Sequence, residues 1–157
     1  MVRMTPPIRI TLCSVLDLRF FKAVTCSGKL ERTVAAEGQR FLGWRDVPVN
    51  TDHIGQVATE CMPTIRQFFV AKGESVADER AFDRKLYVIR KIIEHAVEDA
   101  QLSEPDDFYI CSLSPTIVVY KGLLKGEQIK GFYLDLSDPS METSFVLVHS
   151  RFSTNTL

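Results

Sequence analysis

The clearest pattern of apolar positions along the chain is a helical stripe in its middle. The apolar residues recur at steps of three and four: Phe82, Leu86, Ile89, Ile93 and either Ala96 or Val97. Charged residues occupy the intervening positions: Arg84, Arg90, Lys91, Glu94 and Glu98. This spacing predicts an amphipathic helix packed on a sheet, with Arg90 and Glu94 as an i,i+4 ion pair on its solvated face. The same basic residues could also bind an anion, but a solvated face explains them more simply.

Strands are predicted where apolar, aromatic and β-branched residues run together between turn residues. Five such runs are present: 41–49, 64–71, 108–113, 116–121 and 144–152. Pro48 favours an edge position or a strand exit for the first run, because proline cannot donate a ladder hydrogen bond. Ser114-Pro115 between the third and fourth runs is a hairpin signal. The last run holds four consecutive apolar residues and is expected to be a buried strand that closes the sheet.

Shorter helical segments are predicted between these strands. Residues 30–38 have a modest helical character, and Gly38 suits a left-handed stop after them. The segment Asn50-Thr51-Asp52 can cap a short helix over about 53–61. The glycine-bounded segment 122–131 is expected to hold at most one helical turn.

Residues 1–29 are predicted to be an irregular start that belongs to no recognisable element. Their basic residues include Arg3, Arg9, Arg19 and Lys22, whereas Asp17 is their only acid. They also mix turn residues such as Pro6-Pro7 with short apolar runs. A weak organelle-targeting leader would have a similar composition, but the irregular start is the favoured interpretation.

The length and composition fit one intracellular domain. A chain of 157 residues with 45% apolar and 25% charged residues can bury a single core. Its net charge of -1 gives no support for nucleic-acid or anionic membrane partners, and no apolar run reaches a membrane span. The cysteines contain no Cys-x-x-Cys pair, which argues against a zinc or redox site: Cys13, Cys26, Cys61 and Cys111. We expect a cytoplasmic protein, with a plastid or other organelle stroma as the alternative.

The end of the last predicted strand carries the candidate chemistry. His149, Arg151 and Ser153 follow the apolar run at alternate positions, and Thr154 comes next. A guanidinium matches a carboxylate through two charge-assisted hydrogen bonds, so Arg151 is a candidate carboxylate ligand. The alternative is an arginine that pairs with a structural acid at the strand end, and the spacing alone favours that ion pair.

The residue sequence of this segment also resembles a known family signature. The residues His149-Ser150-Arg151-Phe152-Ser153-Thr154-Asn155-Thr156 resemble the His-x-Arg-aromatic-Ser/Ala-Thr signature of class II glutamine amidotransferases, in the form found in the large subunit of glutamate synthase. Other blocks resemble that family in its order: Gly43–Val49, Lys85–Lys91, Phe108–Ser114, Val119–Leu124 and Asp135–Pro139. The resemblance implies an internal fragment of the amidotransferase domain over residues 30–157, after an unmatched leader at 1–29. It also implies an α/β fold, as part of the four-layer αββα sandwich of N-terminal-nucleophile hydrolases.

The resemblance further implies a chemistry that this chain does not fully encode. Family members hydrolyse the side-chain amide of glutamine, with an N-terminal cysteine thiol as nucleophile and its own α-amine as base. This chain begins with Met1, and neither Cys13 nor Cys26 is followed by the family's Gly-x-Gly-Phe. The family's oxyanion-stabilising Asn-Gly pair and a later Asp that binds the substrate amine are not present either. We therefore expect no catalytic residue and no metal ligand here.

What remains is a partial pocket for glutamine or glutamate. By the resemblance, Arg151 binds the α-carboxylate weakly, and three residues form the wall of the pocket: His149, Ser153 and Thr154. No cofactor is expected in this chain, because the FMN and the iron-sulfur cluster of the resembling family belong to its later domains.

Three hypotheses for the function follow. The first is a fragment of the amidotransferase domain of glutamate synthase, inactive alone, with the rest of that enzyme as its partner. The parental function is glutamine hydrolysis that supplies ammonia for glutamate formation. The second is a non-catalytic module that binds glutamine, glutamate or another protein, and the third is a truncated product without function.

Overall fold

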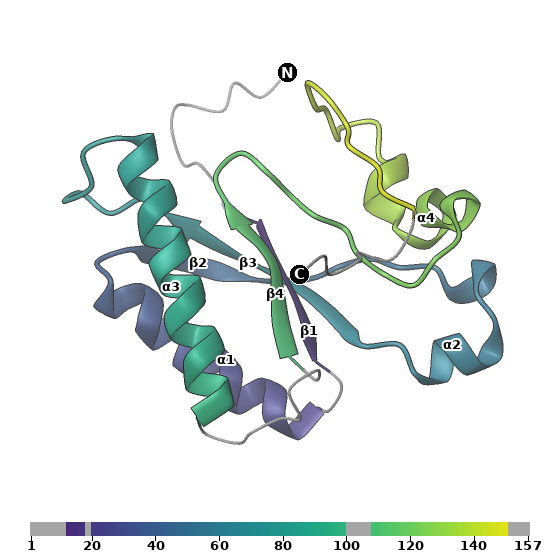
Figure 1. Cartoon of the computed structure of the whole chain (residues 1–157), viewed down its shortest axis with the longest axis horizontal. Helices are drawn as coiled ribbons and strands as arrows, with labels where there is room; N and C mark the ends of the chain where they lie inside the picture. Colours follow the sequence, from purple (N-terminus) through teal and green to yellow (C-terminus); the bar gives the residue numbers. More distant parts are fainter. Residues whose placement is uncertain (1–11, 18–19, 100–107, 151–157) are drawn as a thin grey trace, which may run out of the picture. The chain divides into compact units, whose positions relative to one another are not determined.

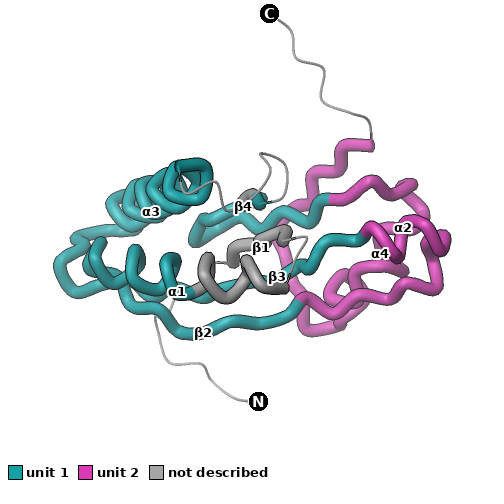
Figure 2. Tube along the Cα trace, turned by 90° about the horizontal axis from the view of Figure 1, so that it is seen from below, with its two compact units in different colours: residues 1–46, 62–121 teal, residues 47–61, 122–157 magenta. Residues whose placement is uncertain are grey.

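The computed structural model describes residues 12–17, 20–99 and 108–150, and its backbone divides into two units (Figures 1 and 2). The first unit comprises residues 1–46 and 62–121, and the second comprises 47–61 and 122–157. The first unit contains a sheet with two long helices, whereas the second contains short helices and irregular segments. Mixed helices and strands agree with the expected α/β class.

The sheet of the first unit is antiparallel throughout, with strand order β2-β3-β1-β4. Its strands are β1 (Leu12–Asp17), β2 (Arg40–Asp46), β3 (Thr64–Ala71) and β4 (Phe108–Ser114). The long helices are α1 (Phe20–Ala36) and α3 (Glu79–Asp99). Strand β3 has the predicted bounds, and β2 lies at the edge that Pro48 led us to expect.

Strand β1 and the start of α1 correct the prediction that residues 1–29 belong to no element. Within β1, Cys13 lies opposite Phe68 of β3 on one side and opposite Leu113 of β4 on the other. Helix α1 begins at Phe20, ten residues before the predicted helical segment at 30–38. The prediction failed because a short strand takes its stability from neighbours that lie far away in the sequence. The end of α1 was predicted correctly: Gly38 has a φ of 70°, which glycine adopts without steric cost.

Both long helices contribute to one hydrophobic core. The buried residues of α3 are the predicted stripe, with Val97 rather than Ala96 at its end: Phe82, Leu86, Ile89, Ile93 and Val97. Helix α1 contributes Leu30 and Val34, and the strands contribute Phe68, Val70, Phe108 and Ile110. The helices also contact each other, so α1 and α3 cover the same face of the sheet (Figure 1).

The second unit is built from short helices. They are η1 (Thr51–His53), α2 (Gln56–Glu60), α4 (Gly126–Phe132) and η2 (Leu134–Ser137). An isolated antiparallel bridge joins Val49 to Tyr133, and the Asn50 N–H donates to the Phe132 carbonyl at 2.8 Å. The Gln128 amide also donates to the His53 carbonyl at 2.7 Å. These bonds connect the two chain segments that form this unit.

The second unit modifies two helix predictions. The helix expected over 53–61 is two short helices, η1 and α2, and the Asn50 side chain caps the first by accepting from the Asp52 N–H. Residues 122–131 were expected to hold at most one turn, but α4 extends over seven residues. Its start is stabilised by Gln128, whose side-chain oxygen accepts from the Lys125 N–H at 2.9 Å.

Two strands predicted from apolar runs are wrong. Within the predicted strand 116–121, residues 117–121 have no regular structure, and the Val119 N–H donates to the Ser112 hydroxyl at 3.1 Å. The predicted closing strand 144–152 is absent over its described part, where residues 145–150 are irregular. Its apolar residues Phe145 to Val148 are 67–90% exposed. A strand needs a neighbour that accepts its ladder hydrogen bonds, and no described strand pairs with either segment.

Candidate functional site

The structure describes one of the four predicted site residues. His149 is exposed and lies in the irregular segment, so the expected buried strand does not present its side chain. Arg151, Ser153 and Thr154 lie outside the described residues. The glutamine pocket therefore stays a prediction, and the polar clusters that the structure does describe lie on other elements.

An aromatic and ionic cluster joins β2, β3 and α1. The Arg66 guanidinium lies 4.7 Å from the centre of the Trp44 ring, and its Nε is 2.8 Å from an Asp46 carboxylate oxygen. The Trp44 indole N–H donates to the Glu31 carboxylate at 3.0 Å, and its ring packs on Phe68. A cation over an aromatic face contributes roughly 0.5–1 kcal/mol at such a partly exposed site. These contacts hold the edge strand β2 against the core. We therefore assign this cluster a structural role and no catalytic or binding role.

A polar pair of one half-buried and one buried residue lies one position further along the same strands. Arg45 and Gln67 are opposite each other in register, and the Arg45 Nη1 donates to the Gln67 Oε1 at 2.7 Å. Side chains alternate along a strand, so this pair lies on the sheet face opposite Phe68 and the two helices. Gln67 is fully buried, and its amide nitrogen has no hydrogen-bond partner among the residues that the structure describes. We did not predict this residue; its signal in the sequence is an amide directly before the apolar residues Phe68 to Ala71 of the same strand.

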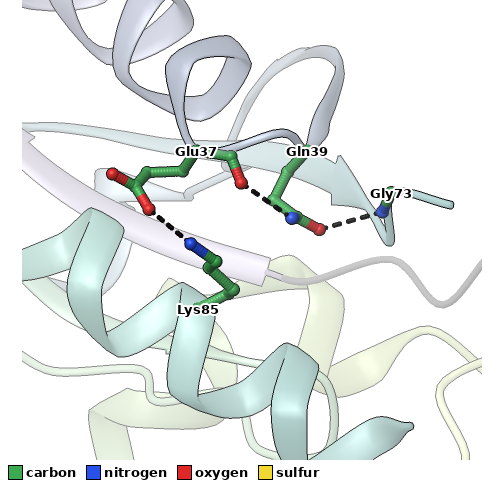
Figure 3. Close-up of polar contacts among 4 residues, drawn as sticks. All are labelled: Glu37, Gln39, Gly73 and Lys85. Atoms are coloured by element: carbon green, nitrogen blue, oxygen red, sulfur yellow. Dashed lines mark hydrogen bonds and ion pairs between the residues drawn. The ribbon is translucent and has the colours of Figure 1, made fainter. Parts of the chain in front are cut away.

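A third cluster joins the end of α1 to the segment that follows β3 (Figure 3). The buried Gln39 side chain donates to the Glu37 carbonyl at 3.0 Å and accepts from the Gly73 N–H at 2.9 Å. The Lys85 ammonium lies 2.8 Å from the Glu37 carboxylate. Both hydrogen bonds of the Gln39 side chain are to backbone groups. The cluster therefore holds two chain segments together, and we assign no ligand to it.

Helix α3 has the predicted ion pair of Arg90 with Glu94, and Lys91 joins it as a second cation that was not predicted. Glu94 accepts from Arg90 at 2.7 Å and from Lys91 at 2.8 Å. Burial by itself would raise the pKa of Glu94, but the hydrogen bonds from Lys91 and Arg90 outweigh it and hold the pKa below its ordinary value. The hydrogen bond to Glu94 in turn raises the pKa of Lys91. Because both cations already have a carboxylate, the solvated-face interpretation fits better than an anion site.

Two further classes of site find no support in the part of the chain that the structure describes. No three His, Cys, Asp or Glu side chains gather there in a way that could hold a metal ion. None of the helices in residues 20–99 and 108–150 is long and apolar enough to cross a membrane.

Comparison with known proteins identifies the family of this chain, which the geometry of the described residues does not. The family of class II glutamine amidotransferases matches residues 15–157. The glutamate synthase [NADPH] large chain of Bacillus subtilis (strain 168) is 48% identical over 132 residues, which are 82% of this chain and 8% of the relative. That of Azospirillum brasilense is 44% identical over 131 residues, 83% of this chain and 8% of the relative. The ferredoxin-dependent glutamate synthase 1, chloroplastic/mitochondrial, of Arabidopsis thaliana is 46% identical over 129 residues, 81% of this chain and 8% of the relative.

This chain thus spans less than a tenth of the length of these relatives. The family match begins inside β1 and includes every later element of both units, as well as the segment His149 to Thr156. Because a match of that extent covers most of the 157 residues, this protein belongs to the class II glutamine amidotransferases.

Proposed function

We propose that this chain is part of the amidotransferase domain of a glutamate synthase, in which it contributes to the hydrolysis of glutamine that supplies ammonia for glutamate formation. The observation that carries the proposal is the family match over residues 15–157, together with 40–48% identity to glutamate synthases from bacteria and plants. The rest of the synthase is the partner that this assignment implies. Its compartment is the cytoplasm or, as several relatives are named chloroplastic, the plastid stroma.

The finer fold that we propose is part of an αββα sandwich. Helices α1 and α3 and the four-stranded sheet would form one α layer and one β layer of it. The support is one-sided packing: both long helices cover the same sheet face, and the buried Gln67 lies on the other. A second sheet would pack on that other face in the complete domain.

In the same proposal, Arg151 binds the α-carboxylate of glutamine. Its planar fork of donors suits that group, and the neighbouring side chains form the wall: His149, Ser153 and Thr154. The exposed position of His149 in the described segment is compatible with a pocket that becomes complete only when further parts of the synthase surround it.

We also propose that the 157 residues alone do not hydrolyse glutamine. A nucleophile that uses its own α-amine as base must be the first residue of its chain. Cys26 lies inside α1, and cleavage before it would remove β1 from the middle of the sheet. Cys61 and Cys111 follow the strands and helices that the core requires, and a cut before either would remove them. No cysteine after β1 can therefore become an N-terminal nucleophile without loss of the sheet, and Cys13 within β1 is not followed by the family's Gly-x-Gly-Phe.

A segment exchange tests this function. The matching 132 residues of the Bacillus subtilis large chain would be replaced by their counterparts from this protein, and ammonia release from glutamine would be measured. We expect the hybrid to keep glutamine hydrolysis, and Arg151→Lys in the hybrid to raise KM for glutamine about tenfold with a smaller effect on kcat. Arg32→Lys, at an exposed position of α1, is the matched control and should leave both constants unchanged.

Three outcomes would decide between the hypotheses. A folded hybrid without glutamine hydrolysis would contradict the assignment to this domain. Equal KM values for the hybrid and its Arg151→Lys variant would show that Arg151 is a structural ion-pair residue. Ammonia release by the isolated 157-residue chain, above a heat-inactivated sample, would contradict the proposed lack of activity.

A further inference from the structure

The outward face of α3 carries both exposed apolar residues and an uneven distribution of charge. We define this outer face of α3 by the exposed residues on the side away from the buried stripe: Arg80, Arg84, Tyr87, Val88, Ile92, His95, Glu98 and Asp99. Val88 and Ile92 are 41% and 40% exposed, one turn apart at the middle of the helix. Basic residues lie toward the N-terminal end of this face, and acidic residues lie at its C-terminal end.

This order of charges is unfavourable for an isolated helix. The helix dipole favours acids near the N-terminus and bases near the C-terminus, whereas the outer face has Arg80 in the first turn and Glu98 and Asp99 in the last. The last turn of α3 contains no basic residue of its own. Glu79, seven residues before Leu86, lies on the side of the buried stripe and does not alter the outer face. An arrangement that costs stability within one helix points to a partner that compensates it.

We propose that a second copy of this chain binds the outer face of α3, with the two α3 helices antiparallel about a twofold axis. A twofold axis between Val88 and Ile92 places Val88 of each copy against Ile92 of the other, so the apolar centre is self-complementary. Arg80 lies eight residues before Val88, and Asp99 lies seven residues after Ile92, so these two charges meet across the interface. Arg84 approaches Glu98 of the second copy within about one turn. The basic end of each α3 thus lies against the acidic end of the α3 of the other copy, and the twofold axis makes the two contacts identical.

Two other charged residues near this face have partners within the chain. Asp83 accepts from the Ser114 hydroxyl at 3.2 Å and lies toward β4. Lys91 is paired with Glu94. The charge complementarity of the proposed dimer therefore rests on the four residues at the ends of the face, and the apolar contact rests on Val88 and Ile92.

The contact area of two single helices is small, so the dimer is weak and concentration-dependent. Stable interfaces bury about 800 Å² on each partner, and one helix face offers less than that. The full 157-residue chain should therefore move from monomer to dimer over a concentration series in sedimentation velocity, with a midpoint that rises as salt is added.

Charge reversal tests the proposal directly. The first variant, Arg80→Glu with Arg84→Glu, has acidic groups at both ends of the face; the second, Glu98→Lys with Asp99→Lys, has basic groups at both ends. Each should dimerise about tenfold more weakly than the wild type, or not at all. A mixture of the two variants should form a heterodimer, because every acidic end then meets a basic one. The fourfold variant, with its pattern inverted, should dimerise again.

The design separates association from folding. Both charge reversals agree better with the helix dipole than the wild-type residues do, so neither should unfold α3, and far-UV circular dichroism checks this. Glu127→Lys with Glu142→Lys makes the same change in net charge as the second variant, at exposed positions of the second unit, and should leave the dimer intact. Ile92→Lys should abolish it.

The proposal is overturned by any of three results. They are a wild-type chain that stays monomeric at every concentration, a mixture of the two variants that sediments as monomers, and a loss of dimer in the Glu127/Glu142 control. Self-association through another surface, such as the exposed run Phe145 to Val148, would be the same in all charge variants and would count against this interface.

Discussion

At the scale of single residues, the sharpest constraint is at Gly73. A Cβ atom added there would lie 1.9 Å from the carbonyl oxygen of Gly38 and 3.1 Å from its carbon. Both are backbone atoms that cannot turn aside, and the Gly73 N–H is also held by Gln39. Gly28, inside α1, has nothing within 4 Å of the same position. The two glycines therefore have opposite roles: one is required by packing and the other is not.

This contrast predicts opposite effects of the same substitution. Gly73→Ala should lower the free energy of unfolding by about 1–3 kcal/mol, because the backbone must shift to admit the methyl group. Gly28→Ala should raise it by up to about 1 kcal/mol, because alanine is the better helix former. Urea denaturation followed by circular dichroism measures both. Effects of the same sign would show that the close approach of Gly73 to Gly38 is wrong.

The hydrogen bond between Arg45 and the buried Gln67 predicts different stabilities for two substitutions at Gln67. Gln67→Met removes an acceptor from Arg45 and should destabilise the fold by about 1–3 kcal/mol, even though the volume is nearly kept. Gln67→Glu keeps an acceptor for Arg45 and removes the amide nitrogen that has no partner, so it should be the milder change. Thermal unfolding of the two variants at pH 7 gives the comparison, and a more stable Met variant would contradict it.

The proposed carboxylate site predicts how substitutions change the affinity for glutamate. If Arg151 binds the α-carboxylate, the affinity of the chain for glutamate should fall by on the order of 1 kcal/mol in Arg151→Lys, because lysine keeps the charge but not the two-bond match. His149→Ala removes only a wall of the pocket and should weaken binding less. Calorimetric titration with glutamate distinguishes these cases, and equal affinities for the wild type and Arg151→Lys would favour a structural ion pair.

At the scale of elements, the sequence predicts those helices and strands whose pattern lies within their own residues. Helix α3 was predicted from its apolar stripe, and β3 from a run of residues between turn signals, because their own residues carry the pattern. The runs at 116–121 and 144–152 have equally strong β propensity, yet no described neighbour offers them a ladder. Gln67 in the sheet escaped prediction for the same reason, since its partner Arg45 is 22 residues away.

The ion pairs of α3 make one part of its stability dependent on pH. The lowered pKa of Glu94 means that its contribution is present at neutral pH and is lost as the pH falls through the folded-state value. The raised pKa of Lys91 means that its contribution is present below its usual pKa and is lost as the pH rises through the folded-state value. Glu94→Gln should therefore lower stability by a few tenths of a kcal/mol at pH 7, a value typical of exposed pairs.

This difference should disappear in acid. Once the pH is below the lowered folded-state pKa of Glu94, its carboxyl is protonated in the folded protein, so wild type and Glu94→Gln should unfold at the same urea concentration. Glu127→Gln, an exposed acid without a described ion pair, is the control and should be neutral at both pH values. A Glu94→Gln effect that is as large in acid as at pH 7 would assign it to packing.

At the scale of the whole molecule, the exposed run Phe145 to Val148 is a liability. Four adjacent apolar residues that are 67–90% exposed and without charge have the composition of a segment that pairs with other chains. We expect the isolated chain to aggregate as its concentration is raised. Leu147→Lys should raise its solubility several-fold, whereas Leu123→Lys, at a leucine that is nearly as exposed but lies outside this run, should not. Light scattering during concentration measures this, and equal benefits from both substitutions would contradict it.

The interior position of β1 also has a consequence for the order of events during synthesis. β1 ends at Asp17, whereas β3 begins at Thr64 and β4 is complete only at Ser114, 97 residues after Asp17. At a synthesis rate of about 5–20 residues per second, β1 waits roughly 5–20 s for its second neighbour. Pairings so distant along the chain also slow folding once all residues are available. The nascent chain therefore presents an unpaired strand for seconds, and this interval is the time in which a chaperone would act on it.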